Sequence, residues 1–168
     1  SQGAEIFGTI IPPAIKMLKD KGYTIKIQQQ CISNQKSKIV DYYNVNNIEN
    51  YVFEFKKDIL ELIYSSDLAI TRSGASTTDE LVYTRTPFIT VSLPNSIDNH
   101  QYLNAKFYTD KGYCLMLEQD NFSVKNLFDV VVDLIRNKSK LLNIRENMKN
   151  NKIHDVYSVI ESQINHLI

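Results

Sequence analysis

The chain has 168 residues, of which 43% are hydrophobic and 23% charged, and its 19 basic side chains balance 19 acidic ones. This length suits one domain with a single hydrophobic core. A net charge of zero provides no field to attract the phosphates of DNA or RNA, so we expect no nucleic-acid partner. Because no apolar run approaches the roughly 20 residues that span a bilayer, we expect a soluble globular domain.

Two cysteines, Cys31 and Cys114, are too few for a disulfide framework, and their spacing to the histidines matches no zinc pattern. We therefore expect reduced thiols in a cytosolic setting. The sequence begins with Ser1 and not with Met, without a signal peptide. We interpret this start as a position inside a longer protein.

Apolar residues at helical spacing between Ile6 and Leu18 predict helical structure in the first part of the chain. We expect Pro12 and Pro13 to divide it into two helices, the second with proline in its first turn. The next segments, in order, are a strand at 23–28, a polar stretch without a clear period at 33–50, a strand at 51–55, a helix at 58–66 and a strand at 68–71.

Strands and helices continue to alternate after the loop at 72–76. The predicted segments are a helix at 77–84, a strand at 88–91, a helix at 99–110, a strand at 113–117 and helical segments from 124 to 164. Leu103 and Phe107 mark the inward face of the helix at 99–110, and Ser123 should cap the helix after it. The predicted fold class is α/β, a Rossmann-like doubly wound parallel sheet.

Three loops fall where strands of such a sheet end and helices begin, which is where ligands bind. They are 1–4, 72–76 and 98–101. In the first two, small residues open a helix, and the N–H groups and dipole at a helix start suit a phosphate. Small residues also occur in such turns for steric reasons alone.

Two side chains near the second loop have two possible roles each. Glu80 lies three residues after Thr77, which fits a helix capping box as well as a carboxylate that binds ribose hydroxyls. Arg72 could reach a phosphate or could fix the loop through a carboxylate.

A polar cluster, Asn99, His100, Gln101 and Asn104, opens the helix after the third loop. It fits a solvated helix start, but amide groups also suit sugar hydroxyls and phosphate oxygens. The chain has no pair of aspartates of the kind that holds a divalent ion on a diphosphate. We therefore predict neither a metal nor a cofactor.

In combination, these motifs resemble the C-terminal, nucleotide-sugar-binding half of the MurG family of glycosyltransferases, of the family 28 type. The resemblance covers nearly the whole chain and rests on Ser1-Gln2-Gly3-Ala4, Glu54 to Asp58, Asp67 to Glu80, and His100-Gln101 with Asn104-Ala105. It implies one half of a GT-B glycosyltransferase, with 1–168 as a single UDP-GlcNAc-binding domain. An acceptor-binding domain and a first strand would precede Ser1.

The resemblance also implies roles for individual residues. Ser1 and Gln101 would stabilise the leaving diphosphate, Lys56 would lie beside the uracil, and Glu80 would bind the ribose hydroxyls. The implied substrate-binding residues are Ser1, Lys56, Gly74, Ala75, Ser76, Glu80, His100, Gln101 and Asn104. No other catalytic group is expected in this chain.

The activity that the resemblance implies is an inverting transfer of GlcNAc from UDP-GlcNAc to undecaprenyl-diphospho-muramoyl-pentapeptide, lipid I to lipid II, in peptidoglycan synthesis. The whole enzyme would contact the cytoplasmic face of the bacterial plasma membrane peripherally, and this chain alone would bind the donor weakly and transfer nothing. Two alternatives stay open. One is a non-hydrolysing UDP-GlcNAc 2-epimerase, which shares a similar Ser-Gly turn, and the other is a non-catalytic donor-binding subunit of a two-part GlcNAc transferase.

Overall fold

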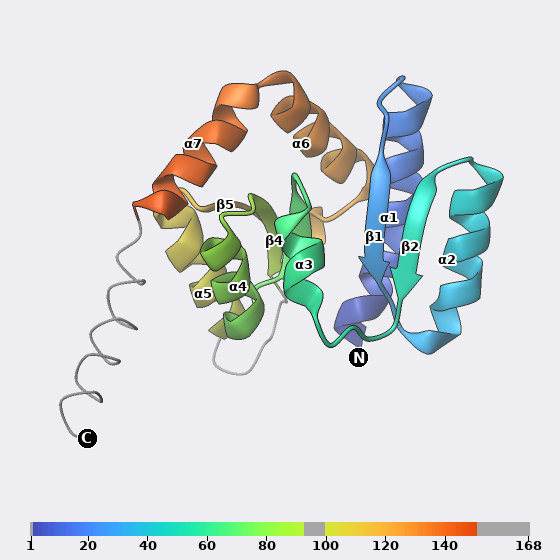
Figure 1. The fold of residues 1–168 in the computed structure, drawn as a ribbon, viewed down its shortest axis with the longest axis horizontal. Coiled ribbons are helices and arrows are strands. Elements are labelled where there is room, and N and C mark those ends of the chain that lie inside the picture. The colour runs from blue at the N-terminus through green and yellow to red at the C-terminus, as the bar shows by residue number, and fades with distance from the viewer. Residues whose placement is uncertain (1, 93–99, 151–168) are drawn as a thin grey trace.

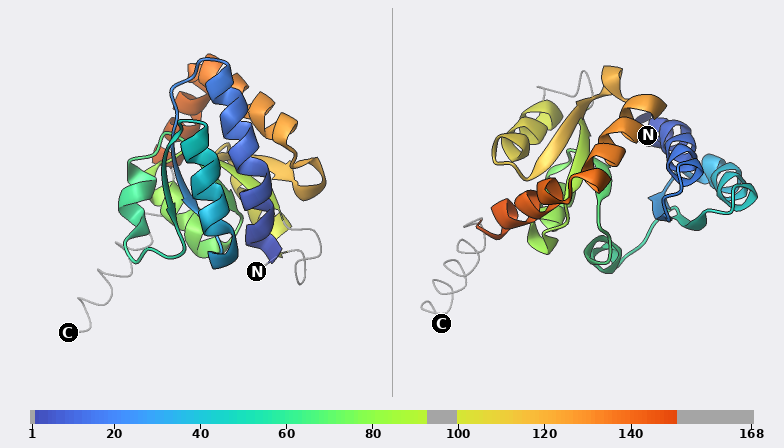
Figure 2. Two further views of the ribbon diagram at one scale, coloured as in Figure 1. Left: turned by 90° about the vertical axis from the view of Figure 1, so that its right-hand side faces the viewer. Right: turned by 90° about the horizontal axis from the view of Figure 1, so that it is seen from above.

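A computed structural model describes residues 2–92 and 100–150 of the chain. Strands alternate with helices along the chain, and α1 and α3 lie on opposite sides of the strands in the view from above (Figures 1 and 2). The elements are α1 (Gln2–Asp20), β1 (Lys26–Gln30), α2 (Ser33–Val45), β2 (Glu49–Phe53), α3 (Ile59–Tyr64), β3 (Ala69–Arg72), α4 (Ala75–Thr84), β4 (Phe88–Ser92), α5 (His100–Asp110), β5 (Cys114–Glu118), the 3-10 helix η2 (Gln119–Asn121), α6 (Val124–Arg136) and α7 (Lys138–Lys149). The predicted α/β fold class is confirmed.

The described strands form two parallel sheets, one of order β1-β2 and one of order β3-β4-β5. Lys26 pairs with Glu49 in the first sheet, and in the second Phe88 lies between Ala69 and Cys114. All residues of β4 are buried, because it is the central strand of its sheet. This explains why its sequence is a run of apolar residues and Thr rather than an alternation.

One hydrophobic cluster connects the two sheets. It joins Val52 of β2 and Val91 of β4 with Leu18 of α1 and Leu127 of α6. The helices α1 and α6 pack against each other, and both contribute side chains to this cluster. A second cluster, centred on Phe88, lies among α3, α4, α5 and α7.

The prediction that two prolines divide the first helix is wrong, because α1 is continuous from Gln2 to Asp20 with Pro12 and Pro13 inside it. A proline within a helix costs roughly 3 kcal/mol. Further along the same helix, the side chains of Ala14 and Leu18 are each only 1% exposed. Burial of this face of the helix offsets the lost backbone hydrogen bonds.

The polar stretch at 33–50 contains a helix, α2, that the sequence did not reveal. Its buried residues are Ile39 and Tyr43, one turn apart. Two inward residues are too few to make a visible period in a segment rich in Asn, Lys and Ser. The strands on either side are also displaced by about two residues from the predicted 23–28 and 51–55.

The predicted inward face of α5 is wrong as well. Leu103 and Phe107 are 57% and 48% exposed, whereas Ala105 and Tyr108 are buried. The buried face is therefore rotated away from the largest apolar side chains. Phe107 instead contacts the ammonium of Lys111, whose Nζ lies 4.2 Å from the ring centroid.

The N-cap predicted for α6 is confirmed. The hydroxyl of Ser123 accepts a hydrogen bond from the N–H of Asn126 at 3.2 Å. Leu127, Val131 and Leu134 are buried along one face of the helix, as its spacing predicts. The last predicted helical segment, which carries Val156, Ile160 and Ile164, lies outside the described residues. None of the helices described here has the length and apolar character to span a membrane.

Candidate functional site

The predicted ligand-binding segments gather at one edge of the parallel strands. Parallel strands end at the same edge, so the helices that follow them begin there. Figure 1 shows the start of α1 beside the carboxyl ends of β1 and β2. Ser1 and the loop residues Asp98 and Asn99 lie outside the described part of the chain.

The turn after β3 presents an open helix start. Gly74 is the N-cap of α4, in an extended conformation (φ −69°, ψ 137°), and no side chain caps the helix. A methyl group at Gly74 would meet no atom of residues 2–92 or 100–150 within 4 Å. Gly74, Ala75 and Ser76 are all exposed. The start of α4 is therefore exposed and its N-cap residue provides no capping side chain, which is an arrangement that suits an anion.

The capping-box interpretation of Glu80 is wrong. The helix begins at Ala75, so Thr77 lies inside its first turn and cannot be the N-cap. Glu80 is half-buried, and its carboxylate has no hydrogen bond or ion pair to any residue within 2–92 or 100–150. The carboxylate is therefore available to accept hydrogen bonds from a ligand.

Hydrogen bonds fasten the start of α5 to the turn after β3. The hydroxyl of Ser73 donates to the carbonyl of Gln101 at 2.6 Å. The amide of Asn104 donates to the carbonyl of Ser73 at 2.8 Å and to the hydroxyl of Thr78 at 3.2 Å. The structure thus brings Gln101 and Asn104 to the turn that holds Gly74.

Ser73 lies in the loop predicted at 72–76, but it was not among the predicted substrate-binding residues. It is 2% exposed and lies next to Gly74. A serine before a glycine in a turn is common, so its sequence position alone carried no signal. His100, by comparison, is exposed in the first turn of α5.

A second connection between α4 and α5 lies one turn further along. The buried Tyr108 hydroxyl donates to Asp79 at 2.5 Å. Burial and this hydrogen bond raise the pKa of Tyr108 to about 12. The two helices are therefore joined by side-chain hydrogen bonds at two positions, one turn apart on α5.

The segment that follows β2 includes an apolar side chain exposed to solvent. The Nζ of Lys56 lies 5.7 Å from the centroid of the Tyr51 ring, and Phe55 is 80% exposed. Glu54 accepts a hydrogen bond from Ser33, which together with the charge of Lys36 holds the pKa of this carboxyl below its usual value. Lys56 follows β2 of the two-stranded sheet, as Gly74 follows β3 of the three-stranded one.

Arg72 connects several elements at this edge. It donates to the carbonyl of Val91 at 3.2 Å and to the Oε1 of Gln119 at 2.7 Å. Its guanidinium carbon lies 5.1 Å from the centroid of the Phe7 ring in α1. Partial burial lowers the pKa of the guanidinium. The contacts with Phe7 and Gln119 had no signal in the sequence.

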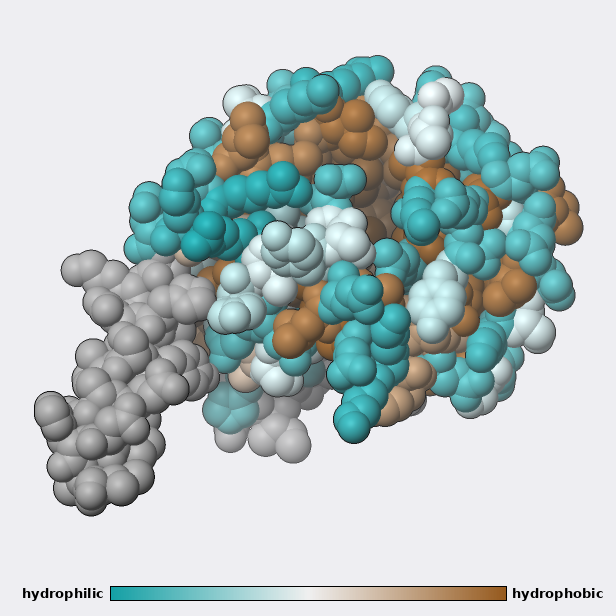
Figure 3. Space-filling view, viewed as in Figure 1, coloured by the Kyte–Doolittle hydropathy of each residue, from teal (hydrophilic) through white to brown (hydrophobic). Residues whose placement is uncertain are grey.

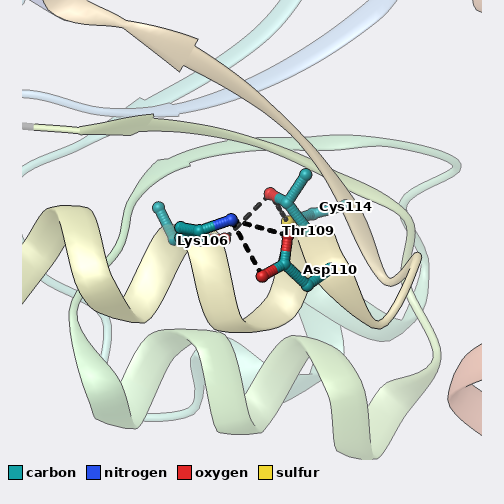
Figure 4. Close-up of polar contacts among 5 residues, drawn as sticks. Lys106, Thr109, Asp110 and Cys114 are labelled. Atoms are coloured by element: carbon teal, nitrogen blue, oxygen red, sulfur yellow. Dashed lines mark hydrogen bonds and ion pairs between the residues drawn. The ribbon is translucent and has the colours of Figure 1, made fainter.

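Cys31 directly follows β1 at this edge, Cys114 begins β5 at the opposite end of the strands, and both are free and buried. Burial raises the pKa of Cys114 to about 11, and its sulfur lies 3.3 Å from the Thr109 hydroxyl at the end of α5 (Figure 4). Beside it, Lys106 pairs with Asp110 at 3.0 Å. In the ranges that the structure covers, no group of three His, Cys, Asp or Glu could hold a metal ion.

Several known proteins are similar to this chain in sequence or in fold. The family model of the glycosyltransferase family 28 C-terminal domain matches residues 1–163. A protein of Pelagibacter ubique (strain HTCC1062), named UDP-N-acetylglucosamine--N-acetylmuramyl-(pentapeptide) pyrophosphoryl-undecaprenol N-acetylglucosamine transferase, is 37% identical over 164 residues, which are 98% of this chain and 46% of the relative. A protein of the same name from Rickettsia felis (strain ATCC VR-1525 / URRWXCal2) is 42% identical over 153 residues, 88% of this chain and 42% of the relative.

The crystal structure of Acinetobacter baumannii MurG superimposes with a TM-score of 0.77 at 26% identity, over 95% of this chain and 47% of the other. The chain spans about half the length of the curated relatives it matches. Sequence and fold thus agree over nearly all of the chain, which belongs to the glycosyltransferase family 28 C-terminal domain family.

Proposed function

We propose that this chain is the UDP-GlcNAc-binding domain of an inverting transferase that moves GlcNAc to undecaprenyl-diphospho-muramoyl-pentapeptide, converting lipid I to lipid II. The names of the relatives support this assignment. The observation that carries it is the open start of α4, uncapped at Gly74 and fastened to the start of α5. Such a start suits the diphosphate of a nucleotide sugar.

In the proposed reaction, a hydroxyl of the acceptor sugar attacks the anomeric carbon of GlcNAc while UDP departs. Negative charge grows on the diphosphate as the bond to the sugar breaks. N–H groups at a helix start therefore stabilise the transition state more than the ground state. We assign this role to the turn Gly74-Ala75-Ser76, together with Ser1 and Gln101.

The remaining predicted residues would hold the rest of the donor. Glu80, whose carboxylate is uncommitted within the described ranges, would accept hydrogen bonds from both ribose hydroxyls. Lys56 would lie beside the uracil at the end of β2, mainly through its backbone. His100 and Gln101 would contact the GlcNAc hydroxyls and the diphosphate, with Asn104 supporting them.

We also infer that the complete protein contains an acceptor-binding domain and a further parallel strand that joins the two sheets. In Figure 1, β1 and not β2 lies on the side toward the three-stranded sheet. Figure 3 shows hydrophobic residues in a hollow between α6 and β1. A strand there would end where α1 begins, as in a right-handed βα unit. The complete enzyme would contact the cytoplasmic face of the plasma membrane peripherally.

The test of the donor is a calorimetric titration of this chain with UDP-GlcNAc and, separately, with ADP-ribose. We expect measurable affinity for UDP-GlcNAc only, and equal affinity for the two would overturn the assignment. Glu80→Gln should weaken UDP-GlcNAc binding about tenfold, whereas the control Glu61→Gln on α3 should not change it.

The test of the reaction uses the complete protein with a lipid-linked acceptor. We expect transfer of GlcNAc by the complete protein and none by the 168-residue chain. Formation of UDP-ManNAc instead would indicate a 2-epimerase. Donor binding that leads to transfer only after a separate membrane protein is added would indicate a non-catalytic subunit.

A further inference from the structure

Phe7 is the point at which the start of α1 is anchored to the rest of the molecule. Its ring packs edge to face on Phe122, with centroids 5.4 Å apart, and lies against the guanidinium of Arg72. Its carbonyl accepts a hydrogen bond from the side chain of Gln29 in β1 at 3.5 Å. One residue of α1 is thus in contact with both sheets.

Arg72 supplies the contact with the three-stranded sheet. Its planar guanidinium donates to the end of β4 at Val91 and to Gln119 after β5, while one face lies over Phe7. A lysine ammonium cannot reproduce this set, because it lacks both the planar fork and the stacking face. The arrangement therefore depends on arginine itself and not on a positive charge alone.

Arg72 is also next to Ser73, whose hydrogen bonds hold the turn at Gly74. Any shift of Arg72 relative to Phe7 would change the distance between the start of α1 and the start of α4. Under the function proposed above, both helix starts contact one diphosphate. Small misplacements of such groups lower the rate more than they lower binding.

We propose that Arg72 is a positioning residue that, through Phe7 and Gln119, fixes the start of α1 relative to the start of α4. It acts through these neighbours and not as a ligand of the diphosphate. This inference rests on the proposed function where it concerns catalysis. Its structural part, that Arg72 immobilises the first turns of α1, can be measured without any ligand.

The first experiment measures hydrogen exchange of backbone amides in the complete protein. Arg72→Lys should accelerate exchange about tenfold in residues 5–11 of α1 and leave α6 unchanged. The control Arg136→Lys, an exposed arginine at the end of α6, should change neither. Unchanged exchange in α1 overturns the proposal, whether or not the protein transfers GlcNAc.

The second experiment measures transfer by the complete protein with Arg72→Lys, Gln119→Leu and the double variant. We expect kcat to fall about tenfold in Arg72→Lys with KM for UDP-GlcNAc within about twofold. Gln119→Leu should show part of this loss, and the double variant should match Arg72→Lys, because both changes act on one contact.

Three results would overturn the positioning role. In the first, Arg72→Lys weakens UDP binding while Gln119→Leu has no effect, which indicates direct contact with the diphosphate. In the second, the melting temperature falls while kcat is unchanged, which indicates a stabilising role alone. In the third, Arg72→Lys retains full kcat and stability.

A wild-type protein that binds UDP-GlcNAc no better than ADP-ribose would instead refute the proposed function.

Discussion

The two sheets end differently at the edge where the ligand segments meet. At the end of β3, side chains are tied together: Ser73 to the start of α5, and Asn104 back to Ser73 and the start of α4. At the end of β2, Phe55 is 80% exposed and Lys56 lies over Tyr51. The turn after β3 is joined to the start of a second helix by side-chain hydrogen bonds, whereas beyond Glu54, which is hydrogen-bonded to Gln30 and Ser33, the end of β2 is open at Phe55.

This difference fits the proposed division of the donor between the two sides. Charge that develops during reaction is stabilised best by donors that are already in place, and the three-stranded side faces the proposed diphosphate and sugar. A flat base needs contact area and a few backbone groups. The open side at Lys56 can supply those without a rigid network.

The largest effect expected from this comparison is on stability, at two phenylalanines. Phe88 in β4 is 0% exposed, whereas Phe55 is 80% exposed. Phe88→Ala should lower the free energy of unfolding by about 4 kcal/mol, and Phe55→Ala by less than about 0.5 kcal/mol. Urea unfolding followed by circular dichroism measures both. Similar losses would show that the end of β2 is packed as tightly as the other side.

The second prediction compares asparagines from the two sides. Asn104→Leu leaves the carbonyl of Ser73 without its partner and should cost about 2 kcal/mol. The amide of Asn50, in β2, donates to Asn44 and to the carbonyl of Ile48 nearer the surface. Asn50→Leu should cost about 0.5 kcal/mol. A larger loss of stability in Asn50→Leu than in Asn104→Leu, measured by chemical unfolding, would show that the hydrogen bonds of the three-stranded side are not the stronger ones.

The third prediction concerns Tyr108, whose hydroxyl donates to Asp79 between α4 and α5. Tyr108→Phe should cost about 1 kcal/mol at neutral pH. A tyrosine in the unfolded chain ionises near pH 10, whereas the folded pKa of Tyr108 is about 12. The wild-type protein should therefore lose stability between pH 10 and 12.

The matched variant for this pH effect is Tyr43→Phe on the other side, where burial also raises the pKa of Tyr43. Each variant should remove part of the alkaline loss of stability, which thermal melting at pH 9 to 11.5 measures. An alkaline loss that both variants leave untouched would assign it to other groups.

The smallest effect is expected at an ion pair on the two-stranded sheet. Lys26 and Glu49 lie on adjacent strands with their charged atoms 2.8 Å apart, and both side chains are more than 60% exposed. Lys26→Ala should change stability by less than about 0.5 kcal/mol, and added salt should reduce even that difference. A loss above 1 kcal/mol in thermal unfolding would show that this pair helps to hold the sheet together.

The sequence predicted those elements correctly whose pattern is contained within a few neighbouring residues. The run at 88–91 and the helix capped by Ser123 were predicted correctly, because burial and capping leave patterns over a few neighbouring residues. The helix α2 was missed because its buried face contains few residues, Ile39 and Tyr43. The inward face of α5 was predicted wrongly because its large apolar residues are the exposed ones.

The candidate site divides in the same way. The turn at Gly74 and the cluster at Gln101 could be found because glycine and amide residues stand at predicted helix starts. The contact of Arg72 with Gln119 joins residues 47 positions apart. Only the tertiary structure brings such pairs together, so no local pattern could have indicated it.

The two prolines of α1 have a consequence for motion. Proline donates no backbone hydrogen bond, so the carbonyls of Gly8 and Thr9 lack the partners that Pro12 and Pro13 would otherwise supply. Beyond the prolines, Ala14 and Leu18 anchor the helix in the core. The segment without these bonds is held on one side by Phe7 and on the other by Leu18, so contacts of side chains and not the backbone ladder restrict the start of α1.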